Sequence, residues 1–302
     1  MTAANRDFTL LLLAIVLMLL CLIRPTIPWT QNTFRYLFVL DITQSMNTRD
    51  YHGNDLPADR LSFGKQALRQ AIRDLRCGSE AGIGLFSTKD ILLLIEPLEI
   101  CAHFAAIDDT VSHIDWRMAW SADSNIERGL YGSILAAKNL APGTHLVFLS
   151  DGEQNVRELH RPPLAKHTGT IKGYIIGVGG SGPSPIPKLD QDNRLTGFWS
   201  NREVGEVSIG PEGLEASAQK SSGPEANYQS TLHESNLQML AAMTGLGYHR
   251  LESPEQFSKI LQAEELAEPR TVETDIGWLF AMLSLLLILA VYLVPLKTTY
   301  RD

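Results

Sequence analysis

The chain has 302 residues, of which 44% are hydrophobic and 20% are charged, and its formal net charge at pH 7 is -8. This length and composition can bury one large core, which excludes a disordered protein. The negative charge leaves no basic stripe to neutralise phosphates, which excludes nucleic acid as an expected partner.

An apolar block begins the chain. Residues 8–23, FTLLLLAIVLMLLCLI, carry no charge, and the following sequence RPTIPW lacks the small-residue cleavage site of a signal peptide. We therefore expect an uncleaved membrane anchor over residues 1–24, although the uncharged run is a little short for a span of about 20 residues.

A strand and a helix are predicted next. FRYLFVL, residues 34–40, is a short apolar run typical of a strand buried on both faces, and Asp41, Thr43 and Ser45 follow it at spacings of two. Residues 58–75 repeat apolar side chains at helical spacing, which predicts an amphipathic helix.

The middle of the chain continues the alternation. AGIGLF and ILLLIEP, on either side of STKD, predict a hairpin, and helical patterns cover residues 103–114 and 126–140. Ser124 lies just before the second of these helices. HLVFLS, residues 145–150, predicts another buried strand, which is followed by Asp151, and residues 171–180 repeat the strand pattern.

Two cysteines, Cys77 and Cys101, flank a predicted strand. In an oxidising compartment they can form a disulfide, and otherwise they are two buried free thiols. Both interpretations stay open.

An insertion interrupts the pattern at about residues 181–230. Its proline-rich start predicts a hairpin, and the polar stretch 210–229 predicts a mobile loop. Asp190, Asp192 and Asn193 resemble the start of a calcium loop, but no glycine stands at the sixth position and no glutamate closes the loop, so we favour a hairpin turn.

Regular structure returns with residues 235–251, predicted as a helix and a short strand, and with the helix 254–262. Strands that alternate with helices predict an α/β fold with a mainly parallel sheet. Residues 276–296 are apolar and long enough for a second transmembrane helix. Arg6 precedes the first uncharged run, and Lys297 and Arg301 follow the second span, which predicts cytoplasmic termini and a periplasmic domain.

Ligands of open α/β sheets bind at the carboxyl ends of strands, so Asp41 and Asp151 share one crevice if their strands are neighbours. Asp41, Thr43 and Ser45 can converge on a hard divalent cation such as Mg²⁺. Because hydroxyl ligands are neutral, the ion would keep positive charge and attract a carboxylate from a partner. The competing interpretation is that Thr43 and Ser45 cap a helix while Asp41 holds a loop.

Three motifs in order, DITQSM, SNIERGL and LSDGE, resemble those of the von Willebrand factor type A domain over about residues 33–262. The resemblance implies a doubly wound, Rossmann-like, six-stranded sheet of order 3-2-1-4-5-6, with Asp41 and Asp151 on adjacent strands. It also implies a metal-ion-dependent adhesion site made of Asp41, Thr43, Ser45, Ser124 and Asp151, with Mg²⁺ as the expected ion and Ca²⁺ or Mn²⁺ as alternatives. Thr43 and Ser124 exchange the family's usual Ser and Thr but keep a hydroxyl.

Within that family, DITQSMN, HIDWRMAW and PSPIPKLD are similar to bacterial inner-membrane proteins associated with MoxR-type AAA ATPases, in particular the accessory proteins of methanol oxidation. This resemblance implies a non-enzymatic maturation factor that assists assembly or metal insertion in a periplasmic quinoprotein dehydrogenase. The implied partners are a client that supplies an acidic residue, sister membrane proteins and the ATPase.

Other functions are weighed against this one. A phosphoryl-transfer enzyme of the haloacid dehalogenase type would use Asp41 as its nucleophile but needs a second aspartate where Thr43 stands. A scaffold without metal is a third option. Trp116 and Trp120 suit either a partner anchor or half-buried loop packing, and we favour packing.

Overall fold

The structure is a computed structural model that describes residues 3–52, 57–119, 124–154, 156–158, 162–201, 203–204, 207–210, 213–216 and 226–293. The chain divides into two units. Unit 1 combines Met1–Asn32 with Pro269–Asp302, and unit 2 is Thr33–Glu268.

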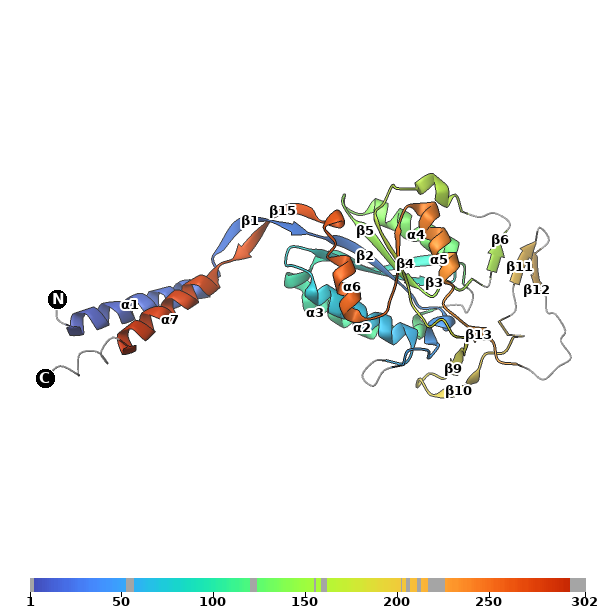
Figure 1. The fold of residues 1–302 in the computed structure, drawn as a ribbon, viewed down its shortest axis with the longest axis horizontal. Coiled ribbons are helices and arrows are strands. Elements are labelled where there is room, and N and C mark those ends of the chain that lie inside the picture. Colours follow the sequence, from blue (N-terminus) through green and yellow to red (C-terminus); the bar gives the residue numbers. More distant parts are fainter. Residues whose placement is uncertain are drawn as a thin grey trace. The chain divides into compact units, whose positions relative to one another are not determined.

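Unit 2 is built on a six-stranded sheet in the order β14-β7-β5-β2-β3-β4 (Figure 1). Neighbouring strands run parallel except β3 and β4, which form the predicted antiparallel hairpin. Counted along the chain, the six strands have the predicted order 3-2-1-4-5-6, so the predicted α/β sheet is confirmed. The strands are β2 (Arg35–Asp41), β3 (Glu80–Ser87), β4 (Asp90–Glu99), β5 (His145–Ser150), β7 (Gly173–Gly177) and β14 (Gly247–Arg250).

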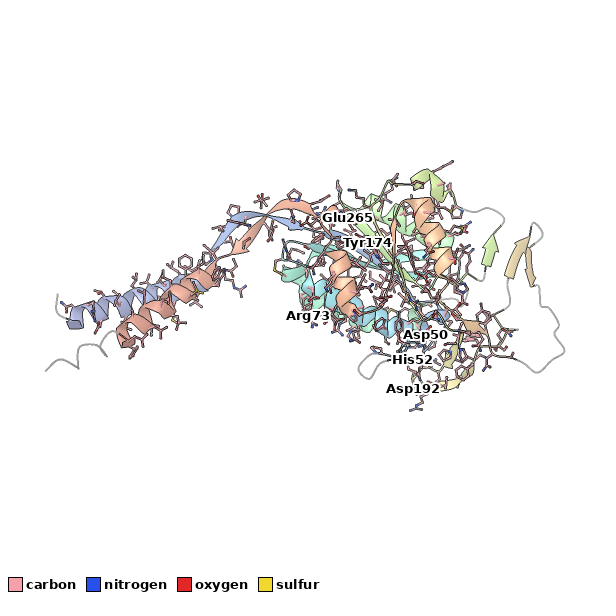
Figure 2. The ribbon with its side chains drawn as sticks, viewed as in Figure 1. Asp50, His52, Arg73, Tyr174, Asp192 and Glu265 are labelled. Atoms are coloured by element: carbon pink, nitrogen blue, oxygen red, sulfur yellow. A yellow bond between two sulfur atoms is a disulfide. The ribbon has the colours of Figure 1, made fainter. Side chains whose placement is uncertain are left out.

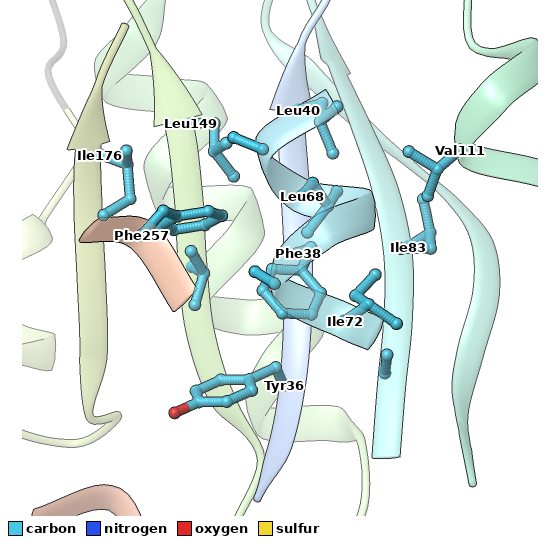
Figure 3. Packing of buried hydrophobic residues seen from close by; sticks show 14 of the residues in the cluster. Tyr36, Phe38, Leu40, Leu68, Ile72, Ile83, Val111, Leu149, Ile176 and Phe257 are labelled. Carbon is cyan, nitrogen blue, oxygen red and sulfur yellow. The ribbon is translucent and has the colours of Figure 1, made fainter. Parts of the chain in front are cut away.

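Strand β2 is buried on both faces because its side chains alternate between two cores. Tyr36, Phe38 and Leu40 pack in the core that α2, α3 and α6 cover, part of which Figure 3 shows. Leu37 and Val39 face the core under α4 and α5. These helices are α2 (Arg60–Asp74), α3 (Ile100–His113), α4 (Ile126–Asn139), α5 (Glu234–Thr244) and α6 (Pro254–Leu261). Short 3₁₀ helices are η1 (Gln44–Asn47), η2 (Trp116–Met118), η3 (Leu164–His167) and η4 (Glu264–Leu266).

Helix α3 begins three residues before the predicted start at His103. The Glu99 carboxylate accepts the backbone N–H of Ala102 at 2.6 Å, which caps a helix that begins at Ile100. A glutamate is not among the usual capping residues, so the apolar pattern alone placed the start too late.

The segment between β7 and α5 contains short strand pairs. β9 (Pro187–Leu189) and β10 (Leu195–Phe198) pair antiparallel, and β8 (Ser184–Pro185) pairs with β13 (Gln229–Ser230). Within the predicted mobile loop of residues 210–229, β12 (Gly213–Ala216) pairs with β11 (Val207–Gly210), and β11 pairs with β6 (Val156–Glu158). A polar composition does not reveal that a segment pairs through its backbone with a strand distant in the sequence. Residues 217–225 lie outside the described residues.

Cys77 and Cys101 are bonded in the structure, with their Sγ atoms 1.93 Å apart and their Cα atoms 5.3 Å apart. The bond ties the connection after α2 to the first turn of α3, near the start of β3 and away from its carboxyl end. It therefore strengthens the edge of unit 2 at which the parallel strands begin.

Unit 1 contains helix α1 (Ala3–Leu22), all but the last residue of strand β1 (Thr26–Thr33), all but the first residue of strand β15 (Glu268–Asp275), and helix α7 (Gly277–Leu293). Strand β1 pairs with β15. The two helices are in contact: the Ser284 hydroxyl donates to the carbonyl of Ala14 at 3.0 Å, and the Cys21 thiol donates to the carbonyl of Gly277 at 3.3 Å.

Among the described residues, one helix is long and apolar enough to cross a membrane, over Asn5–Leu22. Helix α7 is also apolar, but its 17 described residues are fewer than the predicted span of 276–296. Residues 294–296 lie outside the described part of the chain.

Candidate metal site

The predicted site residues lie where the parallel strands of unit 2 end. Asp41 is the last residue of β2, and Asp151 directly follows β5, the parallel neighbour of β2. Neither aspartate has exposed surface, and Thr43, Ser45 and Ser124 are also buried. The sheet thus brings the first and third motifs together, although 110 positions separate their aspartates in the sequence.

Asp41 organises the first loop. Its Oδ1 accepts hydrogen bonds from the backbone N–H of Thr43 (2.9 Å) and from the Thr43 hydroxyl (2.6 Å), and its Oδ2 accepts one from the Ser150 hydroxyl (2.6 Å). The hydroxyl oxygens of Thr43 and Ser45 are 3.3 Å apart. Thr43 immediately precedes η1, yet its side chain makes no capping hydrogen bond, so its hydroxyl faces Asp41 and not the helix end.

Ser124 belongs to the second loop. It forms a parallel β-bridge with Thr88, just beyond the end of β3, and the backbone N–H of Asn125 donates to the carbonyl of Thr88 at 2.6 Å. Asn125 also caps helix α4 through its side chain. These bonds hold Ser124 at the same edge of the sheet as Asp41, because β3 is the other neighbour of β2.

The buried acids repel one another. Burial and the neighbouring charge of Asp151 raise the pKa of Asp41 to about 7, although hydrogen bonds from Ser150 and Thr43 oppose the shift. Burial and Asp151 likewise raise the pKa of Glu153 to about 7. Burial is the larger cause of both pKa shifts and the charge of Asp151 is the second, and a cation bound beside these acids would stabilise their charged forms.

The donors suit a hard cation. Asp41 and Asp151 offer carboxylate oxygens, and Thr43, Ser45 and Ser124 offer hydroxyls, which are the oxygen ligands that Mg²⁺ and Ca²⁺ take. In the described part of the chain, no three His, Cys, Asp or Glu side chains gather into a metal cluster, so this site depends on its hydroxyls. The buried Ser87 and Thr88 hydroxyls have no hydrogen-bond partner among the described residues. Two hydroxyls near Ser124 in the fold are therefore available to bind a further polar group.

Comparisons were made with family models, curated proteins and solved structures. No protein-family model and no curated protein matches the sequence. An aerotolerance-related membrane protein from Bacteroides fragilis is similar in structure, with 18% identity, a TM-score of 0.54, and coverage of 77% of this chain and 98% of that chain. BatB from Bacteroides thetaiotaomicron matches with 16% identity, a TM-score of 0.54, and coverage of 77% and 98%. A von Willebrand factor type A protein from Catenulispora acidiphila is more distant, at 14% identity, a TM-score of 0.45, and coverage of 79% and 44%.

The two Bacteroides structures match with TM-scores above 0.5 over 77% of this chain, and the six-stranded sheet has the order expected from the sequence resemblance. Unit 2 has a von Willebrand factor type A fold. At these identities the comparisons establish the fold and nothing finer.

Unit 2 has a buried arginine beside the candidate site, which was not predicted from the sequence. Arg60, in the first turn of α2, has no exposed surface, and its Nη1 donates to Asp151 Oδ2 at 2.7 Å. Its Nε and Nη2 donate to Asp50 Oδ2 at 2.9 and 2.6 Å. The signal was present in the sequence, because Arg60 lies on the same helical face as Gly64, Ala67 and Ala71.

Two more residues join this domain's buried polar network. The Ser230 hydroxyl donates to Glu153 Oε2 at 2.6 Å and accepts a hydrogen bond from Arg60 Nη1 at 2.9 Å. Glu153 could have been found as the third residue of the DGE motif. Ser230 carries no such signal, since it comes from the end of the insertion.

The remaining candidates of the domain lie outside the site. Trp116 is half-buried, and its indole N–H donates to Asn193 Oδ1 at 2.7 Å, in agreement with loop packing. Asp190 Oδ1 accepts the backbone N–H groups of Asp192 and Arg194, which closes a hairpin turn between β9 and β10. Trp120 lies outside the described residues.

Proposed function

We propose that this chain is a membrane-anchored, metal-dependent protein-binding module without catalytic activity of its own. The observation that carries the proposal is the meeting of Asp41, Thr43, Ser45 and Asp151 at one buried, negatively charged edge of the sheet. Asp41, Thr43, Ser45, Ser124 and Asp151 would hold a divalent cation, Mg²⁺ above Ca²⁺ or Mn²⁺. When bound, the ion supplies positive charge that attracts a carboxylate of the partner.

The two ends of unit 2 lie close together, away from the candidate site. Thr33, at the start of unit 2, donates its hydroxyl to the carbonyl of Glu268, at the end of unit 2, at 3.3 Å. Both residues lie at the edge where β2 begins, and the candidate site lies where β2 ends. The two ends of unit 2 therefore lie at the opposite edge of the sheet from the candidate site.

For the membrane topology, we propose that α7 crosses the bilayer together with α1, so that both termini are cytoplasmic and the domain is periplasmic in a bacterial inner membrane. The contacts of Ser284 with Ala14 and of Cys21 with Gly277 support a helix pair. The Cys77–Cys101 bond supports an oxidising compartment.

The sequence resemblance motivates a more specific role. In this proposal the module works with sister membrane proteins and a MoxR-type ATPase in assembly or metal insertion of a periplasmic client, such as a quinoprotein methanol or alcohol dehydrogenase. The client would present an aspartate or glutamate to the ion.

The test is co-purification of the tagged full-length protein from membranes in Mg²⁺ or in EDTA, with bound proteins identified by mass spectrometry. We expect the client to be captured in Mg²⁺, lost in EDTA, and lost in Asp41→Ala. Asp108→Ala is the matched control, because Asp108 forms an ion pair with Arg69 on α2, remote from the metal-site loops, with donor–acceptor distances of 2.7 Å. Capture that persists in EDTA and in Asp41→Ala would contradict the proposal.

A further inference from the structure

Arg60 is the cation at the centre of the buried polar network. It lies between two acids, Asp50 and Asp151, and Figure 2 labels Asp50 in the loop before α2. Its Nη1 also lies 3.4 Å from the carbonyl oxygen of Ser45, in the first metal-site loop. Asp151, one of the residues that would hold the ion, thus links the guanidinium to the candidate site.

The backbone of unit 2 makes room for this guanidinium. Gly179, after β7, has φ of +140°, and a Cβ atom there would lie 2.7 Å from Arg60 Nε. The backbone N–H of Gly180 donates to Asp50 Oδ2 at 2.8 Å, so the same oxygen serves both Arg60 and this loop. Three loops therefore fix the position of the Arg60 side chain.

Asp151 is already shared before any ion binds. Its Oδ2 accepts from Arg60, and its Oδ1 accepts the backbone N–H of Glu153 at 3.0 Å. A carboxylate paired with a guanidinium offers less net charge to a second cation, and a positive charge so close also repels that cation directly. Of the two aspartates that would bind an ion, Asp151 is therefore already paired with a cation and Asp41 is not. The other proposed ligands are neutral hydroxyls.

We propose that Arg60 determines the ligand preference of the metal site: it weakens binding of the metal alone and favours the metal together with a partner's carboxylate. The inference rests on the proposed metal site and adds its regulation. Arg60 acts here as a positioning and charge-setting residue for Asp151 and does not touch the ion.

The test compares Mn²⁺ binding by the purified full-length protein, its Asp50→Asn variant and its Asp50→Asn/Arg60→Gln variant. Asp50→Asn removes a buried negative charge and keeps an oxygen for Arg60 and Gly180, so we expect at least threefold weaker Mn²⁺ binding than in the wild type. Adding Arg60→Gln removes the positive charge that repels the metal ion. Because position 50 is already neutral in this variant, no buried acid there loses its cationic partner. We expect Mn²⁺ affinity at least tenfold higher in the double variant than in Asp50→Asn.

Acetate serves as the carboxylate probe in the same titrations. We expect acetate, exchanged for chloride, to raise Mn²⁺ affinity more in the wild type than in the double variant, which a merely structural arginine would not produce. Equal Mn²⁺ affinity in Asp50→Asn and in the double variant, or equal gains from acetate, would overturn the inference and leave the metal site standing.

Two further outcomes are decisive. A double variant whose circular dichroism spectrum differs from that of the wild type is misfolded. In that case Asp50→Asn is compared with the wild type, and equal Mn²⁺ affinity of these two proteins overturns the inference. If none of the three proteins binds Mn²⁺ or Mg²⁺, the proposed function fails and the inference fails with it.

Discussion

Asp41 is fully buried, so water does not solvate its charged form. Its pKa is raised from 3.8 to about 7, so the folded state holds the proton more tightly than the unfolded state does. In the metal-free protein, the contribution of Asp41 to stability is therefore expected to fall as the pH rises from about 4 to about 7, with the loss complete above the folded pKa.

The variant Asp41→Asn removes this unfavourable charge. We expect it to raise the free energy of unfolding at pH 7 in EDTA by about 2 kcal/mol, less than the full pKa shift would give because the acids are coupled. Thermal unfolding at pH 5 and pH 7 measures the effect, which should be larger at pH 7. Asp108→Asn is the control: its pKa is lowered by the hydrogen bonds of Arg69, so it gains nothing from neutralisation. An Asp41→Asn protein less stable than the wild type at pH 7 would contradict this electrostatic argument.

Helix α4 has to approach β3 closely to place Ser124. A Cβ atom at Gly129 would lie 2.2 Å from the ring of Phe86 on β3, so glycine is required at this crossing. We expect Gly129→Ala to destabilise unit 2 by about 2 kcal/mol and to weaken metal binding, because α4 must shift with the loop before it.

The matched control is Gly64→Ala, in helix α2, where a Cβ atom would meet nothing within 4 Å. This variant should be stabilised by about 0.5–1 kcal/mol through helix propensity. Chemical denaturation of both variants measures the difference, and equal effects would show that Phe86 does not set the position of α4.

Patterns within one element were readable from the sequence. The apolar run before Asp41 and the run before Asp151 predicted two buried strands, and the family resemblance placed them side by side, as they are in the sheet. Arg60 was missed because a charged residue at a helix start usually faces water. Its place on the buried face of α2 was readable, but its partners Asp50 and Asp151, from two other loops, were not. Ser230 and strand β12 were missed for the same reason, since their partners are distant in the sequence.

For the whole molecule, the membrane topology is testable with reporter fusions. With two spans and cytoplasmic termini, alkaline phosphatase fused after Glu268 should be active, and the same reporter fused after Asp302 should be inactive, because the enzyme needs an oxidising compartment. Activity of both fusions would mean that α1 alone crosses the membrane, and the reverse pattern would place the domain in the cytoplasm.

The proposed function depends above all on whether an ion binds at Asp41. The most direct measurement is calorimetric titration of Mg²⁺ into the metal-stripped full-length protein and its Asp41→Asn and Asp108→Asn variants. We predict one ion per chain in the wild type and in Asp108→Asn, and at least tenfold weaker binding in Asp41→Asn. A wild type that binds no Mg²⁺, Ca²⁺ or Mn²⁺, or an Asp41→Asn protein that binds the ion as tightly as the wild type, would contradict a metal-dependent module.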